Sequence, residues 1–229
     1  MKKTRGKRNW IILLSVVLVA ALAIGTTLAY LSVQTDALTN GFTFVGADPK
    51  GDNDMKAKLT ETDWNEDTSG KNLVPGSEVK KNPVITNTSD VEISEWVALK
   101  ITFQRGDNGE ALTDAELEAL LEVVSIDWNT TDWSEYDGNG AVDISDIYYY
   151  NTQLAQYEET SPLFRIVTIS EAATNKQMDA LIAMGGFNIY VEGAALQGDM
   201  GGTTPFTDAE EAKDDLAALF VEVEPEVEI

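Results

Sequence analysis

Oxygen-bearing side chains gather in one stretch, residues 137–146, which reads Asp-Gly-Asn-Gly-Ala-Val-Asp-Ile-Ser-Asp. Carboxylate and amide oxygens on a turn that glycine permits are the ligands that calcium prefers. The spacing departs from the twelve-residue EF-hand loop and lacks its closing bidentate glutamate. Two interpretations stay open: a calcium site, or an ordinary Asp/Asn/Gly turn before a strand at Ile147. The candidate calcium ligands are Asp137, Asn139, Asp143 and Asp146.

Several kinds of catalytic chemistry are excluded by composition, because the chain contains no His and no Cys. Zinc sites with imidazole or thiolate ligands cannot form, and the HExxH protease motif is absent. No His is present to activate a serine, and there is no Gly-x-Ser-x-Gly elbow or Walker-type phosphate loop. Carboxylates are so abundant that their number gives no support to a paired-carboxylate glycosidase. We therefore expect no enzymatic activity and no required cofactor.

Aromatic residues offer a different chemistry, because sugars stack on exposed rings. The rings that could line such a surface are Trp64, Trp96, Trp128, Trp133 and Tyr148 to Tyr150. In a domain of this size, packing in the core or at its rim is favoured for most of them. A monomeric module that binds cell-wall glycan or a host surface stays open as the alternative function.

The N-terminus has the three parts of an export signal. A basic cluster at residues 2–8 precedes an apolar run at 10–24, and small residues follow at 25–29. The absence of Cys means that export does not bring a disulfide framework with it. The composition fits the surface of a Gram-positive bacterium, so we expect a secreted protein of the extracellular matrix or cell surface.

Cleavage of this leader is predicted before Tyr30. Thr27 and Ala29 are small enough for the narrow −3 and −1 pockets of a signal peptidase. The alternative is an uncleaved anchor, since the uncharged run at 9–35 covers the roughly 20 residues that a spanning helix needs. Membrane contact is expected only through the uncleaved leader.

Charge restricts the partners of the exported part. The chain has 16 basic and 39 acidic residues, and five of the basic ones lie in the leader. Phosphate binding needs clustered Lys and Arg, so nucleic acid is excluded as a partner. Self-association of such an acidic surface depends on salt or divalent cations, because like charges must be screened before they meet. We predict a signal peptide at 1–29, one domain at 30–220 and an acidic tail at 221–229.

Hydrophobic patterns predict the elements that position these residues. Strands are expected at 41–45, 55–60, 79–86, 95–103, 124–128, 147–151, 163–169 and 187–195. The strands at 79–86 and 95–103 are expected to pair as a hairpin across residues 87–90. Helices are expected at 113–124, 175–183 and 207–220, the first and last opened by capping boxes of Thr113 with Glu116 and Thr207 with Glu210. This order predicts a mainly β protein, an antiparallel β-sandwich with short helical insertions, preceded by a signal-peptide helix.

Eight segments in a fixed order carry a resemblance to a known family. They are 25–36 at the cleavage region, 39–45 at the first strand, 59–64, Leu-Val-Pro-Gly at 73–76, Lys-Asn-Pro-Val-Ile-Thr-Asn-Thr at 81–88, Trp-Val-Ala-Leu-Lys-Ile at 96–101, Ser-Pro-Leu-Phe at 161–164 and Gly-Ala-Ala-Leu-Gln at 193–197. Together they resemble the TasA/camelysin family, whose signal peptides are removed by a dedicated SipW-type peptidase.

The resemblance implies a jelly-roll-like sandwich that is secreted and assembles into fibres of a biofilm matrix. The freed N-terminal strand of one subunit would then complete the sheet of the next, and the partners would be the SipW-type signal peptidase during export, then a second copy or a related fibre subunit. The candidate donor-strand residues are Leu38, Phe42, Phe44 and Val45. The alternative is that this strand pairs within its own domain as an edge strand. Some relatives are classed as metalloproteases, and proteolysis is the least favoured function because this chain lacks His.

Overall fold

The computed structural model describes residues 40–44, 55–65, 68–90, 92–199 and 206–220. The predicted signal peptide, its cleavage residues Thr27, Ala29 and Tyr30, and the acidic tail at 221–229 lie outside these ranges. Leu38 and Val45 lie outside them too. Within the described part of the chain, no helix combines the length and the apolar character that crossing a bilayer would require.

The described chain is mainly β with a few short helices, as predicted. The strands are β1 (Asn40–Phe44), β2 (Met55–Glu61), β3 (Glu78–Lys80), β4 (Pro83–Asn87), β5 (Ser94–Arg105), β6 (Val124–Ile126), β7 (Trp133–Glu135), β8 (Ser145–Tyr150), β9 (Ile166–Ile169) and β10 (Phe187–Asp199). The helices are α2 (Asp114–Leu121), α3 (Asn175–Ala183) and α4 (Ala209–Ala218). All strand pairs among them are antiparallel.

One layer contains two three-stranded sheets, ordered β1-β2-β4 and β3-β9-β6. They continue into each other because β3 and β4 follow the same neighbouring segment, residues 157–169. The Lys81 amide donates to the Arg165 carbonyl at 3.0 Å, and the Asn87 amide donates to the Glu158 carbonyl at 3.0 Å. The predicted strand at 79–86 is therefore one run that is interrupted only at residues 81 and 82.

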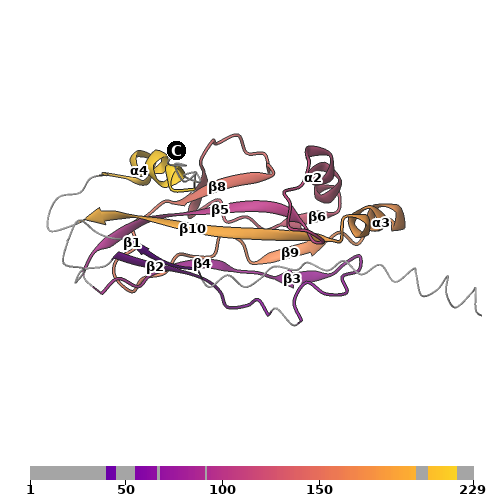
Figure 1. Ribbon diagram of the computed structural model, residues 1–229, viewed down its shortest axis with the longest axis horizontal. Coiled ribbons are helices and arrows are strands. Elements are labelled where there is room, and N and C mark those ends of the chain that lie inside the picture. The colour runs from indigo at the N-terminus through magenta and orange to yellow at the C-terminus, as the bar shows by residue number, and fades with distance from the viewer. Residues whose placement is uncertain (1–39, 45–54, 66–67, 91, 200–205, 221–229) are drawn as a thin grey trace, which may run out of the picture.

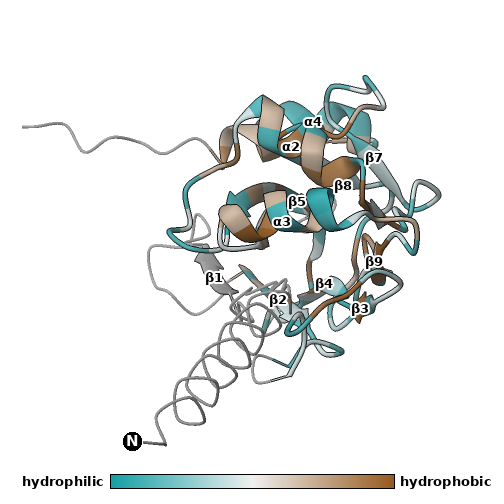
Figure 2. Ribbon diagram, turned by 90° about the vertical axis from the view of Figure 1, so that its right-hand side faces the viewer, coloured by the Kyte–Doolittle hydropathy of each residue, from teal (hydrophilic) through white to brown (hydrophobic). Residues whose placement is uncertain are grey.

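The other layer is a four-stranded sheet, ordered β10-β5-β8-β7. Figure 1 shows β10 and β5 as its two long strands, and Figure 2 shows β5 and β8 on the opposite side of the molecule from β2, β4 and β3. The face that β5 and β10 turn toward the other layer carries the core, as their alternation predicts. Its buried side chains include Val97, Leu99, Ile101, Phe103, Ile189 and Val191, and Leu59, Ile85 and Val167 meet them from the other layer.

The predicted hairpin between 79–86 and 95–103 is wrong. β4 pairs with β2, whereas β5 pairs with β10 and β8, so the two strands lie in different layers. Buried hydrogen bonds hold the chain where it leaves β4: the Asn87 side-chain amide donates to the carbonyls of Ile93 and Leu154, and the Ser89 hydroxyl donates to Glu95 at 2.7 Å. These contacts turn the chain from one layer to the other, which a local turn signal does not reveal.

Helix α4 covers the outer face of the four-stranded sheet. Ala209, Ala212 and Leu216 pack on Trp96 and Ala98 of β5, so both faces of that strand are buried. The N-cap of this helix is Asp208, one residue after the predicted Thr207. The Asp208 carboxylate accepts from the Glu211 amide, while Thr207 donates to the Glu211 side chain. In α2 the predicted box is confirmed, since the Glu116 carboxylate accepts from the Thr113 amide and hydroxyl.

A buried ion pair occupies the interruption between β3 and β4. The Lys81 ammonium lies 2.7 Å from each carboxylate oxygen of Glu61 and 5.0 Å from the centre of the Trp64 ring. Lys81 is 1% exposed, and burial lowers the pKa of its ammonium while Glu61 opposes that shift. A charge held this deep is tolerated because its partner is within contact distance.

Replacing one member of this pair should be strongly destabilising. We expect Lys81→Met to lower the free energy of unfolding by about 3–5 kcal/mol, because Glu61 is left buried without its counter-charge. The double variant Glu61→Leu/Lys81→Met should recover much of that loss. Urea denaturation measures both. Lys100→Met, which breaks the partly exposed pair of Lys100 with Glu192 at 3.5 Å, serves as control and should lose less than about 1 kcal/mol. An equal loss in Lys81→Met and Lys100→Met would contradict the interpretation.

Candidate functional site

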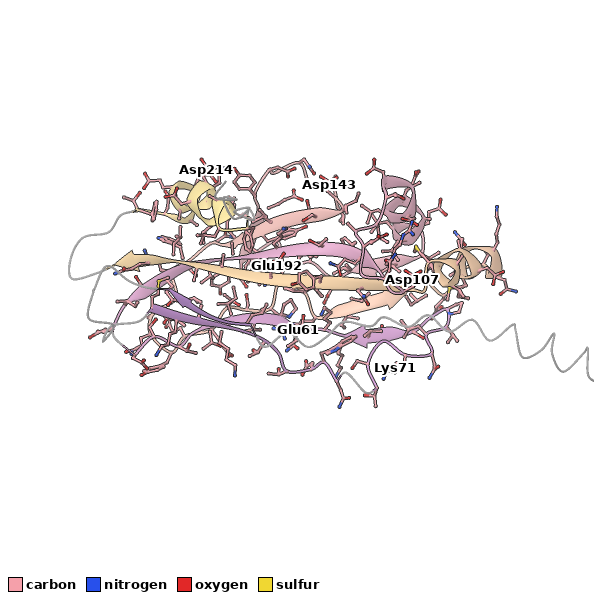
Figure 3. All side chains as sticks on the ribbon, viewed as in Figure 1. Glu61, Lys71, Asp107, Asp143, Glu192 and Asp214 are labelled. Atoms are coloured by element: carbon pink, nitrogen blue, oxygen red, sulfur yellow. The ribbon has the colours of Figure 1, made fainter. Side chains whose placement is uncertain are left out.

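The predicted calcium ligands lie in the hairpin loop between β7 and β8. Trp133, Ser134 and Glu135 pair with Tyr150, Tyr149 and Tyr148, so residues 136–144 form the loop. Gly138 and Gly140 have φ angles of 63° and 69°, a conformation that favours glycine. Figure 3 shows Asp143 on this loop above β8. The structure thus places Asp137, Asn139 and Asp143 in this loop and Asp146 at the start of β8.

The loop is held by its own polar side chains. The Gly140 amide donates to Glu135 at 2.7 Å, and the Ala141 amide donates to the Asn139 side-chain oxygen. The Asn139 amide nitrogen donates to Asp137 and to Asp143. Because acidic side chains accept three of these four bonds, the loop keeps its shape with its carboxylates close to one another.

Asp146 is the buried member of this group, at 7% exposure. Its carboxylate accepts from the Asp143 amide at 2.8 Å. Burial raises the pKa of Asp146 to about 6, the Asp143 amide opposes that shift, and the charges of Asp143, Glu135 and Asp137 add to it. The three other carboxylates therefore act on Asp146 through their charge.

The types of ligand in this arrangement suit calcium, but their placement in the structure does not. The donor set is all oxygen, as calcium requires. The Asn139 nitrogen, however, stands between the carboxylates of Asp137 and Asp143. In the described part of the chain, no three Asp or Glu side chains converge closely enough to hold a metal ion. Turning the Asn139 amide would present its oxygen instead, so calcium stays a prediction.

An aromatic pocket of about 410 Å³ opens on one side of the loop. Its walls include Trp128, Trp133 and Tyr148, with Glu135, Gly140 and Val142 on the side of the loop. Trp128 is half-buried, whereas Trp133 and Tyr148 are buried. The Trp128 ring stacks on Tyr148 with centroids 5.1 Å apart, and it meets Phe164 edge-on at 5.2 Å.

A second, more open groove of about 640 Å³ lies on the other side, against α2. Its apolar lining comes from Leu117 and Leu121 of the helix and from Val142 and Ile144, and its acidic lining comes from Asp114, Glu118 and Asp143. Val142 lines both the pocket and the groove, so the loop forms a wall between them.

Most of the rings considered for a sugar-binding surface are packed inside the protein, as the sequence favoured. Trp64, Trp96, Trp133, Tyr148 and Tyr149 are buried, and their contacts are with the core or with α4. The Trp133 indole donates to the Ser161 carbonyl at 2.9 Å, which fixes its orientation. Trp128 and Tyr150 are only partly buried, and of the two only Trp128 lines the pocket.

The predicted donor strand is present as β1, which pairs with β2 of the same chain. Phe42 stands opposite Ala57 and Phe44 opposite Met55. β1 is the outermost strand of its sheet, so one of its edges has no neighbour in the sheet order of the described chain. This is the arrangement expected of an edge strand, the alternative left open by the sequence.

Glu135 is the site residue that the sequence did not single out. It lies two positions before Asp137, at the end of a strand in which Trp133 and Glu135 share one face. Because alternate residues of a strand lie on the same face, the position of Trp133 could have indicated that Glu135 lies beside the loop.

No protein-family model, curated protein or solved structure matches the chain.

Asp146 should make stability depend on pH. Its carboxyl binds a proton more tightly in the folded state, so the free energy of unfolding falls as pH rises from about 4 to about 6 and is flat above. We expect Asp146→Asn to raise that free energy by about 1 kcal/mol at pH 7 and to change little at pH 4. Urea denaturation in a chelating buffer measures it, with the exposed Asp179→Asn as control. Equal effects of Asp146→Asn at both pH values would contradict the assignment.

Proposed function

We propose that this protein is an exported structural subunit of an extracellular biofilm matrix, which forms or assists fibres by donating its N-terminal strand. The single observation that supports the proposal most is the position of β1, at the edge of its sheet and close to the predicted cleavage position at Tyr30. The resemblance to the TasA/camelysin family, its jelly-roll-like sandwich and its SipW-type peptidase belong to the same proposal.

Strand exchange requires few contacts that a single subunit does not already make. Ten residues, 45–54, connect β1 to β2, and the backbone bonds that β1 makes with β2 are the same in its own chain or in a neighbour. An edge strand also presents unpaired backbone groups that template another strand. While the leader keeps Tyr30 near the membrane, the strand is tethered, so cleavage acts as the switch.

Charge would regulate the assembly. The acidic surface opposes contact between copies until salt or a divalent cation screens it. Calcium at Asp137, Asn139, Asp143 and Asp146 is the cation proposed for this role. The protein would be secreted, with self-association or a related fibre subunit as its partner and without catalysis.

The N-terminus of the exported protein tests the first step. We expect mass spectrometry of protein recovered from culture to give Tyr30 as the first residue, because Thr27 and Ala29 fit the −3 and −1 positions of a signal-peptidase site. Ala29→Arg should leave the leader in place. Recovery of the wild-type protein with residues 1–29 still attached would contradict release of the strand.

Strand donation is tested by a proline in β1. We expect Phe42→Pro to prevent fibre formation, since Phe42 pairs with Ala57 and proline removes the backbone donor that faces the partner strand. Phe42→Val keeps the donor and serves as the matched control, which should form fibres as the wild type does. Electron microscopy of the exported protein, with and without calcium and at low and high salt, measures it. Persistent wild-type monomers under every condition, or normal fibres from Phe42→Pro, would overturn the proposal.

A further inference from the structure

The aromatic pocket beside the β7–β8 loop is independent of the proposed strand exchange. We propose that it binds an alkylammonium ion, a methylated or primary amine whose positive charge sits against the rings. Three features of the pocket carry this assignment: a fixed aromatic wall, an acidic surround and few free hydrogen-bonding groups.

The aromatic wall is already held in place. Trp128 is fixed by Tyr148, which lies nearly parallel to it with an interplanar angle of 16°, and by the edge of Phe164. Trp133 is fixed by its bond to Ser161 and by its contact with Tyr150 at 5.0 Å between ring centres. A ligand therefore meets rings that do not need to reorganise, and the negative faces of such rings attract organic cations.

The charged side chains that line the pocket have one sign, since they include Glu135 and no Lys or Arg. Asp137 and Asp143 lie in the adjoining loop, and Asp146 lies at the start of β8. These carboxylates favour a negative potential at the pocket, which attracts a cation and repels an anion.

A neutral sugar is less well served, because the polar lining is largely engaged within the fold. The Asn129 amide nitrogen donates to Asp132, Ser161 and the Pro162 carbonyl, and its oxygen accepts from the Thr131 and Asp132 amides. Ser134 donates to Asn151 at 2.8 Å. A saccharide needs several free donors and acceptors for its hydroxyls, whereas an alkylammonium ion needs an apolar wall and a nearby negative charge.

The pocket volume of about 410 Å³ is within the range of small-ligand sites. Such an ion could come from a choline-like head group, a lysine side chain or an amino sugar, and these share the chemistry that the pocket recognises. These sources differ in the chemical group that carries the ammonium charge, so probes that differ only in that group distinguish the sources.

Choline and its uncharged isostere 3,3-dimethylbutan-1-ol make the decisive pair, since they have the same shape. We expect choline to bind saturably to the purified protein, followed by tryptophan fluorescence or calorimetry, and the alcohol to bind at least about tenfold more weakly. Butylammonium and glucosamine, compared with butanol and glucose, identify the preferred carrier. Raising NaCl from about 0.05 to 0.5 M should weaken the charged probes several-fold.

Variants locate the binding. Glu135→Gln keeps an oxygen for the Gly140 amide and should weaken choline about fivefold, while the exposed Asp179→Asn on α3 should leave it unchanged. Trp128→Leu should abolish binding, and the melting temperature of each variant reports whether it is folded. Equal affinity for choline and its isostere, tighter binding of glucose than of glucosamine, no saturation by any amine up to about 50 mM, or wild-type affinity in Glu135→Gln would each overturn the proposal.

Discussion

The contact between Lys81 and Glu61 is the interaction on which the rest of the architecture depends. It joins the end of β2 to the point where the β3–β4 run is interrupted, and both side chains are buried. A buried charge demands its partner, so this contact fixes β2 against β4 at Glu61 and Pro83. The contact thus supports the register in which Glu61 pairs with Pro83 and Leu59 with Ile85.

A second buried polar group sets the relation between the two layers. Where the chain leaves β4, the Asn87 amide bonds to the carbonyls of Ile93 and Leu154. The Glu95 carboxyl accepts from Ser89 below the surface, and burial raises its pKa to about 7. This corner directs β5 into the opposite sheet, where it pairs with β8. The loop between β7 and β8 is therefore carried by the sheet that β5 enters after this corner.

The two proposed activities sit in different parts of this frame. Strand donation uses the edge of the β1-β2-β4 sheet, whereas the aromatic pocket and the acidic loop are attached to β7 and β8 of the other layer. Helix α4 lies beside the loop, since the Tyr136 hydroxyl donates to Asp214 at 3.0 Å. A ligand at the pocket and an exchanged strand can thus be present on one subunit together.

The alternation of residues along 95–103 and 187–195 was by itself enough to predict which side chains of β5 and β10 form the core. Local sequence patterns also predicted α2 and the acidic turn. These are short-range properties of neighbouring residues. Sequence did not predict that β4 and β5 separate into two layers, that α4 covers Trp96, or that Glu135 joins Asp146 around Tyr148. Those outcomes depend on contacts between distant residues, such as Asn87 with Leu154 and Glu210 with Tyr149. Only the folded chain decides them, because the burial that makes each contact necessary exists only after the layers have come together.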